Sequence, residues 1–122
     1  MLEKDYNFKL KGTGPISFHL GCDFFRDEDG NLCYAPKKYI KKILDNYKRI
    51  FGANPRTTLS PLAKGDHPEL DTSPLLDDEK TRIYQSLIGA LQWVIQIGRF
   101  DITTAVMTMS RFHAAPHEGH ME

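Results

Sequence analysis

Residues 83–98 read IYQSLIGALQWVIQIG, and the rest of the chain has to be arranged around this stretch. It holds no charged residue between Arg82 and Arg99. On a helix, its apolar side chains cover roughly twice the arc that an ordinary surface helix turns towards the core. A membrane span needs about 20 apolar residues, whereas this run is shorter and contains three glutamines. The stretch predicts a buried central helix, covered from two sides or awaiting a partner.

The charges of the chain balance overall but are unevenly distributed. There are 16 Lys/Arg and 16 Asp/Glu among 122 residues, and the composition, 40% hydrophobic and 26% charged, is that of an ordinary globular domain. Residues 1–56 carry 11 basic and 7 acidic side chains, whereas residues 57–122 carry 5 and 9. This asymmetry predicts a basic docking face in the first half.

The cysteine count and the first residues bear on localisation. Two cysteines, and a first segment MLEKDYNFKL without an apolar core, indicate a reducing compartment. We therefore expect an intracellular protein that is not secreted.

Residues 16–35 alternate between apolar and polar side chains and predict a β-hairpin. A two-residue loop, Asp29-Gly30, would place Tyr34 on the face opposite Phe24. A three-residue loop, residues 28–30 with a left-handed Gly30, pairs Phe24 with Tyr34 on one apolar face, and we predict this register. The same register puts Cys22 and Cys33 on opposite faces, so no disulfide is expected.

Residues 36–52 predict an amphipathic helix that Pro36 opens and Gly52 ends. Its polar face carries one acid, Asp45, and six basic residues, which are the candidate nucleic-acid-binding residues: Lys37, Lys38, Lys41, Lys42, Lys48 and Arg49. A solvated face is the ordinary interpretation of such a pattern, whereas the lopsided sign of the charges favours contact with phosphates. Both interpretations stay open at this point.

The second half of the chain predicts a connector followed by helices. Residues 53–76 contain four prolines and lack periodicity, which indicates an extended connector. Asp77 or Asp78 is expected to cap the central helix, which Gly98 ends. A short final helix is expected to begin at a cap formed by Asp101 and to stop at Pro116.

No catalytic or metal-binding residues are assigned. His19, Cys22, Asp23 and Cys33 resemble a ligand set in composition, but the strand pleat is expected to point His19 away from Cys22. His113, His117 and His120 have ligand-like spacing, yet they straddle Pro116 in a tail that is expected to fray. Asp77-Asp78 resembles in letters the metal-binding pair of polymerases, but its place before a helix is explained by a cap.

Taken together, these features resemble the reverse transcriptase region of copia-type LTR-retrotransposon polyproteins, over about residues 8–120. One departure is Phe100, which stands where the family pattern has proline before the aspartate. The residues that carry the resemblance are, in order, Phe18, Leu20-Gly21, Lys38-Tyr39-Ile40, Ile43-Leu44, Ser60-Pro61-Leu62, Tyr84, Ile88-Gly89, Leu91, Arg99-Phe100-Asp101-Ile102, Ala105-Val106, Ser110-Arg111-Phe112, Pro116 and His120.

The resemblance implies an α+β fragment of a polymerase fold, with residues 1–122 forming a single partial domain. Residues 16–35 would be a hairpin at the end of the palm, 36–52 a thumb-like helix, 53–76 the connector, and 77–115 the helical connection. Such an RNA-directed DNA polymerase uses Mg²⁺ held by aspartates, and no residue here matches them. The resemblance thus implies a fragment that binds no cofactor and is inactive alone.

The implied partners are an RNA/DNA primer-template duplex, held through its backbone phosphates, and the remainder of the polyprotein, with no membrane. A second class of function is a small protein-interaction module that uses the apolar helix 83–97. Dimerisation through that helix is one form it could take.

Overall fold

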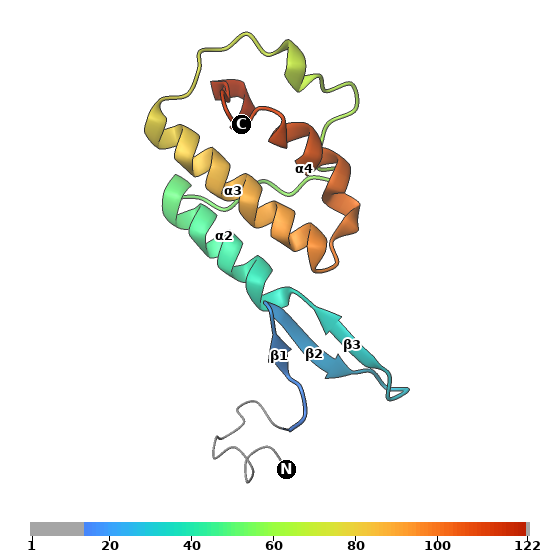
Figure 1. The fold of residues 1–122 in the computed structure, drawn as a ribbon. Helices are drawn as coiled ribbons and strands as arrows, with labels where there is room; N and C mark the ends of the chain where they lie inside the picture. Colours follow the sequence, from blue (N-terminus) through green and yellow to red (C-terminus); the bar gives the residue numbers. More distant parts are fainter. Residues whose placement is uncertain (1–13, 122) are drawn as a thin grey trace, which may run out of the picture.

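The computed structural model describes residues 14–121 and consists of a three-stranded antiparallel sheet followed by three α-helices (Figure 1), which confirms the predicted α+β class. The expectation for the residues MLEKDYNFKL, and the resemblance over residues 8–13, lie outside the described residues. In chain order the elements are β1 (Phe18–His19), β2 (Cys22–Arg26), β3 (Leu32–Ala35), α2 (Lys37–Phe51), α3 (Asp78–Gln96) and α4 (Thr103–Ser110). Short 3₁₀ turns occupy Pro68–Leu70, Phe100–Ile102 and Glu118–His120.

The predicted register of the β2–β3 hairpin is confirmed. Phe24 lies opposite Tyr34, with 6.0 Å between the ring centroids. The backbone N–H of Asp27 donates to the carbonyl of Asn31 at 3.1 Å, which leaves a three-residue loop in which Gly30 has a φ of 82°. Cys33 pairs with Phe25, on the face opposite Cys22, and both cysteines are free.

The hairpin predicted for residues 16–35 is wrong in its first half, which forms two strands and not one. The chain turns at Leu20-Gly21, where φ is 50° and 85°, and β1 then pairs with β2 through His19 and Cys22. Positive φ values at both central residues are typical of a two-residue hairpin turn, because the twist of that turn matches the twist of the flanking strands. The apolar alternation continues across this turn, so its period of two could not reveal the break. Phe18 is consequently 50% exposed.

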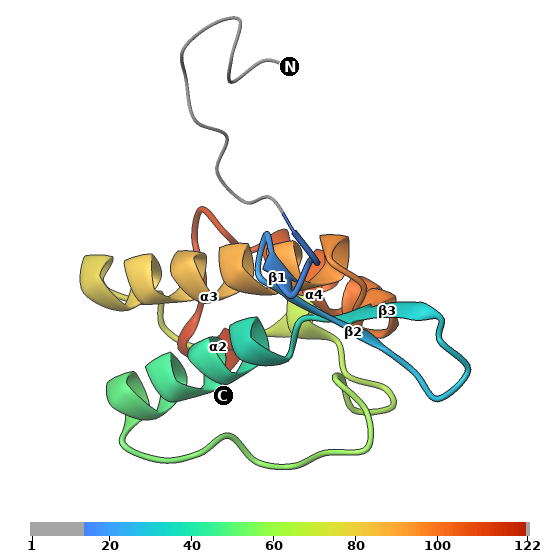
Figure 2. The same ribbon diagram turned by 90° about the horizontal axis from the view of Figure 1, so that it is seen from below.

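Helix α2 runs antiparallel to α3 and packs on it along one side, while the sheet projects from the end where α2 begins (Figures 1 and 2). Pro36 precedes the first helical residue, and Gly52 ends the helix in a left-handed conformation with its N–H bonded to the carbonyl of Lys48. No α2 side chain is fully buried against the described part of the chain. The charged side chains of its polar side are exposed to solvent.

Helix α3 is the centre of the fold, as predicted. Four of its side chains are buried, namely Tyr84, Ile88, Val94 and Ile95. The Tyr84 hydroxyl donates to the carbonyl of Met109 at 2.6 Å and ties α3 to α4. Asp77 is the N-cap, accepting the N–H of Lys80 at 2.8 Å. Within residues 14–121, no helix is both long and apolar enough to cross a bilayer.

Two predictions about the final helix are wrong. Asp101 does not cap it, because the carboxylate instead accepts two hydrogen bonds from the Arg99 guanidinium at 2.8 and 2.7 Å. The pair with Arg99 gives the carboxylate two charge-assisted hydrogen bonds from an ionised donor, whereas a cap would give it a charge-assisted bond from a neutral backbone N–H. Helix α4 also ends at Ser110, six residues before Pro116, whose side chain is buried elsewhere.

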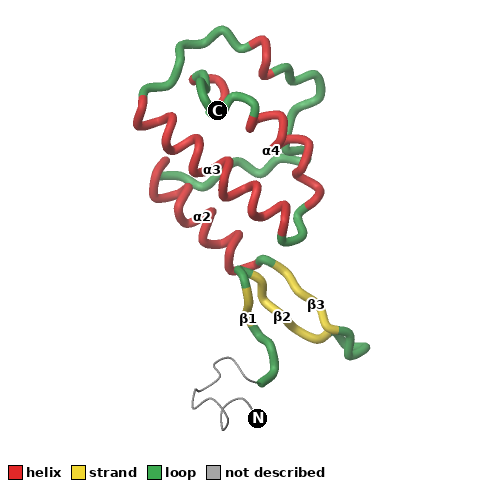
Figure 3. Tube along the Cα trace, viewed as in Figure 1, coloured by secondary structure: helices red, strands yellow, loops and turns green. Residues whose placement is uncertain are grey.

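The prediction that the C-terminal segment frays is wrong as well. Residues 116–120 are bonded to residues 68–76 of the connector, and we call this pairing the terminal clasp (near the C label in Figure 3). Its backbone bonds join Leu76 to Pro116 and Glu118 to Pro74, each at 2.9 Å. Inside it, the buried His120 bonds to the carbonyl of Pro68 at 2.9 Å. Tertiary pairing, invisible in local sequence, thus orders both segments.

Candidate nucleic-acid interface

The six predicted basic residues all lie on the exposed side of α2. This follows from the sequence, because the apolar side chains repeat at helical spacing and turn towards α3. Within the described part of the chain, Lys41, Lys42 and Lys48 make no ion pair and no side-chain hydrogen bond. Their positive charge is therefore available to an outside ligand. Arg49 makes one bond, from its guanidinium to the side-chain oxygen of Asn46 at 2.6 Å.

Lys37 and Lys38 have partners in the sheet. Lys38 Nζ lies 3.1 Å from Asp23 Oδ1 and 5.0 Å from the ring centre of Phe18, and Lys37 Nζ lies 5.3 Å from that of Phe25. The other oxygen of Asp23 accepts the backbone N–H of Lys38 at 3.1 Å. Because Pro36 offers no capping side chain, Asp23 satisfies this helix N-terminus from a neighbouring strand. These two lysines therefore also fasten α2 to the sheet.

The Asp23–Lys38 contact makes stability depend on pH. Partial desolvation raises the pKa of the Asp23 carboxyl, but the hydrogen bonds and charge of Lys38 outweigh this effect and hold it below 3.8. A lowered folded pKa stabilises the fold above about pH 4, and this contribution is lost as the pH falls through the lowered value. We expect Asp23→Asn to lower Tm at pH 7 and the deficit to shrink below about pH 4.

The control for that measurement is Asp66→Asn, which removes an exposed carboxylate of the connector that has no ion pair among the described residues. Thermal denaturation of both variants between pH 2.5 and 7 compares them with the unaltered chain. A Tm deficit for Asp23→Asn that is equal at every pH contradicts the expectation.

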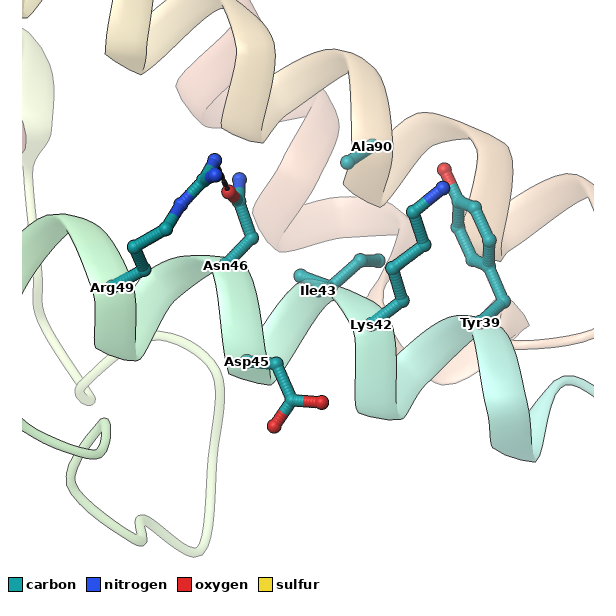
Figure 4. Close-up of a pocket in the computed structure, with 7 residues that line it drawn as sticks. All are labelled: Tyr39, Lys42, Ile43, Asp45, Asn46, Arg49 and Ala90. Carbon is teal, nitrogen blue, oxygen red and sulfur yellow. Dashed lines mark hydrogen bonds between the residues drawn. The ribbon is translucent and has the colours of Figure 1, made fainter.

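A cleft of about 470 Å³ lies between α2 and α3, beside the basic face. Figure 4 shows Lys42, Asn46 and Arg49 directed towards α3, with Tyr39 beside Lys42 and Ala90 on the opposite wall. Sequence reasoning assigned Lys42 and Arg49 to the basic face but missed Tyr39, Asn46 and Ala90. The available signal was the spacing of residues 39, 42, 46 and 49, which places all four along one margin of the helix.

Several members of the histidine, cysteine and acidic sets of the sequence have structural contacts. His19 lies directly opposite Cys22 and so shares its face, contrary to prediction, whereas Asp23 lies on the other face. His120 is committed to the terminal clasp, since its Nδ1 accepts the backbone N–H of His117 at 3.0 Å. Within residues 14–121, no group of three or more His, Cys, Asp or Glu side chains is placed to hold a metal ion. Asp77 acts as the helix cap described above.

Two curated proteins are similar to nearly the whole chain. A putative transposon Ty5-1 protein of Saccharomyces cerevisiae is 28% identical over 116 residues, which are 94% of this chain and 36% of that protein. The retrovirus-related Pol polyprotein from transposon TNT 1-94 of Nicotiana tabacum is 28% identical over 121 residues, 95% of this chain and 9% of the polyprotein. No protein-family profile and no solved structure matches the chain.

The chain thus spans about a third of the length of the yeast protein and about a tenth of that of the tobacco polyprotein. Both names describe transposon proteins, and the two alignments cover the sheet as well as all three helices. The chain is distantly homologous to copia-type retrotransposon Pol polyproteins.

Proposed function

We propose that this chain corresponds to the end of the palm, the thumb and the connection of a copia-type reverse transcriptase, and that it positions a primer-template duplex. The observation that carries the proposal is the polar face of α2, on which Lys41, Lys42 and Lys48 have no partner among the described residues. The homology to retrotransposon Pol polyproteins supports the same function, since the resemblance of the chain is to the reverse transcriptase region of such polyproteins.

The chemistry of this surface suits the phosphate backbone of a duplex and not its bases. Lysine ammonium groups on long exposed stems neutralise phosphates at several positions and release counterions. Contacts of this kind set the register and orientation of a duplex but carry no sequence information. Helix α2 is held to the sheet through Asp23 and to α3 through its apolar side. It would therefore hold the duplex at a fixed distance from these elements.

The proposal assigns no chemical step to this chain. Polymerases hold two metal ions with clustered carboxylates, and in the resemblance those aspartates belong to strands upstream of this segment. The remainder of the polyprotein would then supply the carboxylates and the Mg²⁺. Primer extension by the isolated chain on poly(A)/oligo(dT) with Mg²⁺ would contradict this part of the proposal.

The test is the salt dependence of duplex binding, measured by fluorescence anisotropy with a labelled RNA/DNA hybrid. Each neutralised phosphate contributes about 0.9 units to the slope of log K against log salt concentration. A variant with Lys41, Lys42, Lys48 and Arg49 replaced by glutamine should bind at least about tenfold more weakly and lose up to about 3.6 units of slope.

The matched control neutralises four basic residues outside α2, namely Arg56, Lys64, Lys80 and Arg82, and so changes net charge equally. It should retain most of the affinity and slope of the unaltered chain. A flat slope for the unaltered chain, or equal losses in the two variants, contradicts the proposal.

A protein-interaction module remains the second candidate, favoured by the exposure of Trp93, which is 37% exposed on α3. Phe100, just beyond the end of the same helix, is 68% exposed. Exposed apolar side chains that form a contiguous patch are typical of a partner interface. Sedimentation velocity distinguishes the candidates, because a discrete dimer that Trp93→Gln dissociates favours the module.

A further inference from the structure

The cleft between α2 and α3 gathers hydrogen-bond donors on a single wall. Lys42 and Arg49 reach into it from α2 together with Asn46, and the hydroxyl of Tyr39 lies beside Lys42 (Figure 4). The bond from Arg49 to the Asn46 oxygen, 2.6 Å long, holds the guanidinium towards α3 and turns the amide nitrogen of Asn46 outward as a further donor. The wall therefore offers two positive charges and two neutral donors, together with the apolar side chain of Ile43.

The opposite wall brings no competing charge. Helix α3 contributes Ala90, and the whole stretch between Arg82 and Arg99 is uncharged. The one carboxylate that borders the cleft, Asp45, is directed away from α3 in Figure 4. An anion in the cleft thus meets donors on one side and a small neutral side chain on the other, with no facing carboxylate to repel it.

We infer that this cleft, and not the outer part of the basic face, seats the sugar-phosphate backbone of one nucleic-acid strand. The inference rests on the proposed function and deepens it by giving different roles to the basic residues of α2. Lys42 and Arg49 become the residues that bind the strand, and Tyr39 and Asn46 join them as neutral donors. Lys41 and Lys48, on the outer part of α2, contribute only long-range attraction.

The spacing of the two charges sets the length of strand that the cleft accepts. Lys42 and Arg49 are two helical turns apart, which corresponds to about 10.5 Å along the helix axis. One strand of a duplex carries a phosphate about every 3.4 Å of its axis, so with α2 lying along that axis the two cations are about three phosphate steps apart. The cleft volume of about 470 Å³ admits a backbone segment of this kind. Inorganic phosphate, with one anionic group, should compete only weakly.

The first test compares two double variants on the same helix that remove equal charge. Lys42→Gln with Arg49→Gln empties the cleft of cations, whereas Lys41→Gln with Lys48→Gln leaves it intact. Binding of the full chain to a labelled RNA/DNA hybrid is measured by anisotropy at several salt concentrations. We expect the first pair to lower affinity by about 10- to 100-fold and to remove close to two units of salt slope. The second pair should change affinity by less than about threefold.

The second test fills the cleft without changing charge. Ala90→Leu adds bulk from the α3 wall, and its matched control, Ser86→Leu, adds leucine at an exposed position one turn earlier on the same helix. We expect Ala90→Leu to weaken binding by about fivefold or more, with circular dichroism of both variants unchanged, and Ser86→Leu to have no effect.

The outcomes separate this inference from the function on which it rests. Equal losses of affinity in the two double variants, or full affinity in Ala90→Leu, would show that the strand does not bind in the cleft. Duplex binding by the basic face would still stand. Full affinity in both double variants overturns the seat and removes support for the proposed function as well. The inference is supported if binding is weakened in the Lys42/Arg49 double variant and in Ala90→Leu, but not in the two controls.

Discussion

Replacing Ile88 by alanine is expected to lower the free energy of unfolding by about 3 kcal/mol, within the range of 2 to 5 for buried aliphatic side chains. Ile88 lies at the centre of α3 and is 5% exposed. Few other side chains are buried in the described residues, so neighbouring groups have little capacity to collapse into the space left behind. For a chain of this size the loss corresponds to a fall in Tm of roughly 10–20 °C.

The measurement is urea denaturation followed by far-ultraviolet circular dichroism, together with thermal melting. Leu59→Ala is the matched control, since Leu59 is a fully exposed aliphatic residue of the connector. It removes the same kind of side chain and should leave stability within about 0.5 kcal/mol of the unaltered chain. Equal effects of the two substitutions would show that α3 is not the core.

Replacing His120 by leucine is expected to open the terminal clasp and to cost about 2–4 kcal/mol. Its two ring nitrogens have opposite roles: Nδ1 accepts the N–H of His117 at 3.0 Å, and Nε2 donates to the carbonyl of Pro68 at 2.9 Å. Its ring also stacks on Phe112, with 4.1 Å between centroids. Leucine keeps the volume but leaves a partly buried N–H and a buried carbonyl without partners, which is the costly outcome.

The readout is both global and local. Thermal melting reports the loss of stability, and limited proteolysis reports whether the connector, residues 53–76, becomes more accessible to cleavage. The control is His113→Leu, the same substitution at an exposed histidine that precedes the clasp. If the connector of His120→Leu is cleaved at an unchanged rate, the other bonds of the clasp are sufficient to hold the connector in place. One of them is the bond from the Gly119 N–H to Ser73 Oγ at 2.9 Å.

The candidate site was predictable in its charges and not in its shape. Five lysines and one arginine on one face of residues 36–52 follow from helical periodicity, and the structure places all six on the exposed side of α2. Which of them are already engaged depends on the sheet, because Asp23 reaches Lys38 only once β2 lies beside the helix. The cleft depends on α3 in the same way, since Ala90 forms its second wall.

Local sequence was sufficient wherever the deciding interaction spans only a few residues. The loop 28–30, the left-handed Gly52 and the Asp77 cap each depend on neighbours within about four positions along the chain, and the structure has all three. The turn at Leu20-Gly21 escaped detection even though it is local, because apolar alternation runs through it unbroken.

What the sequence alone determined is therefore the type and periodicity of the elements: an α+β chain, a basic helix, and an apolar helix that has to be central. Only the tertiary structure decided that the tail is clasped to the connector, that Asp23 reaches Lys38, and that Lys42 and Arg49 face a cleft. The physical reason is that each of these outcomes depends on a contact between segments far apart in the chain, which forms only after folding.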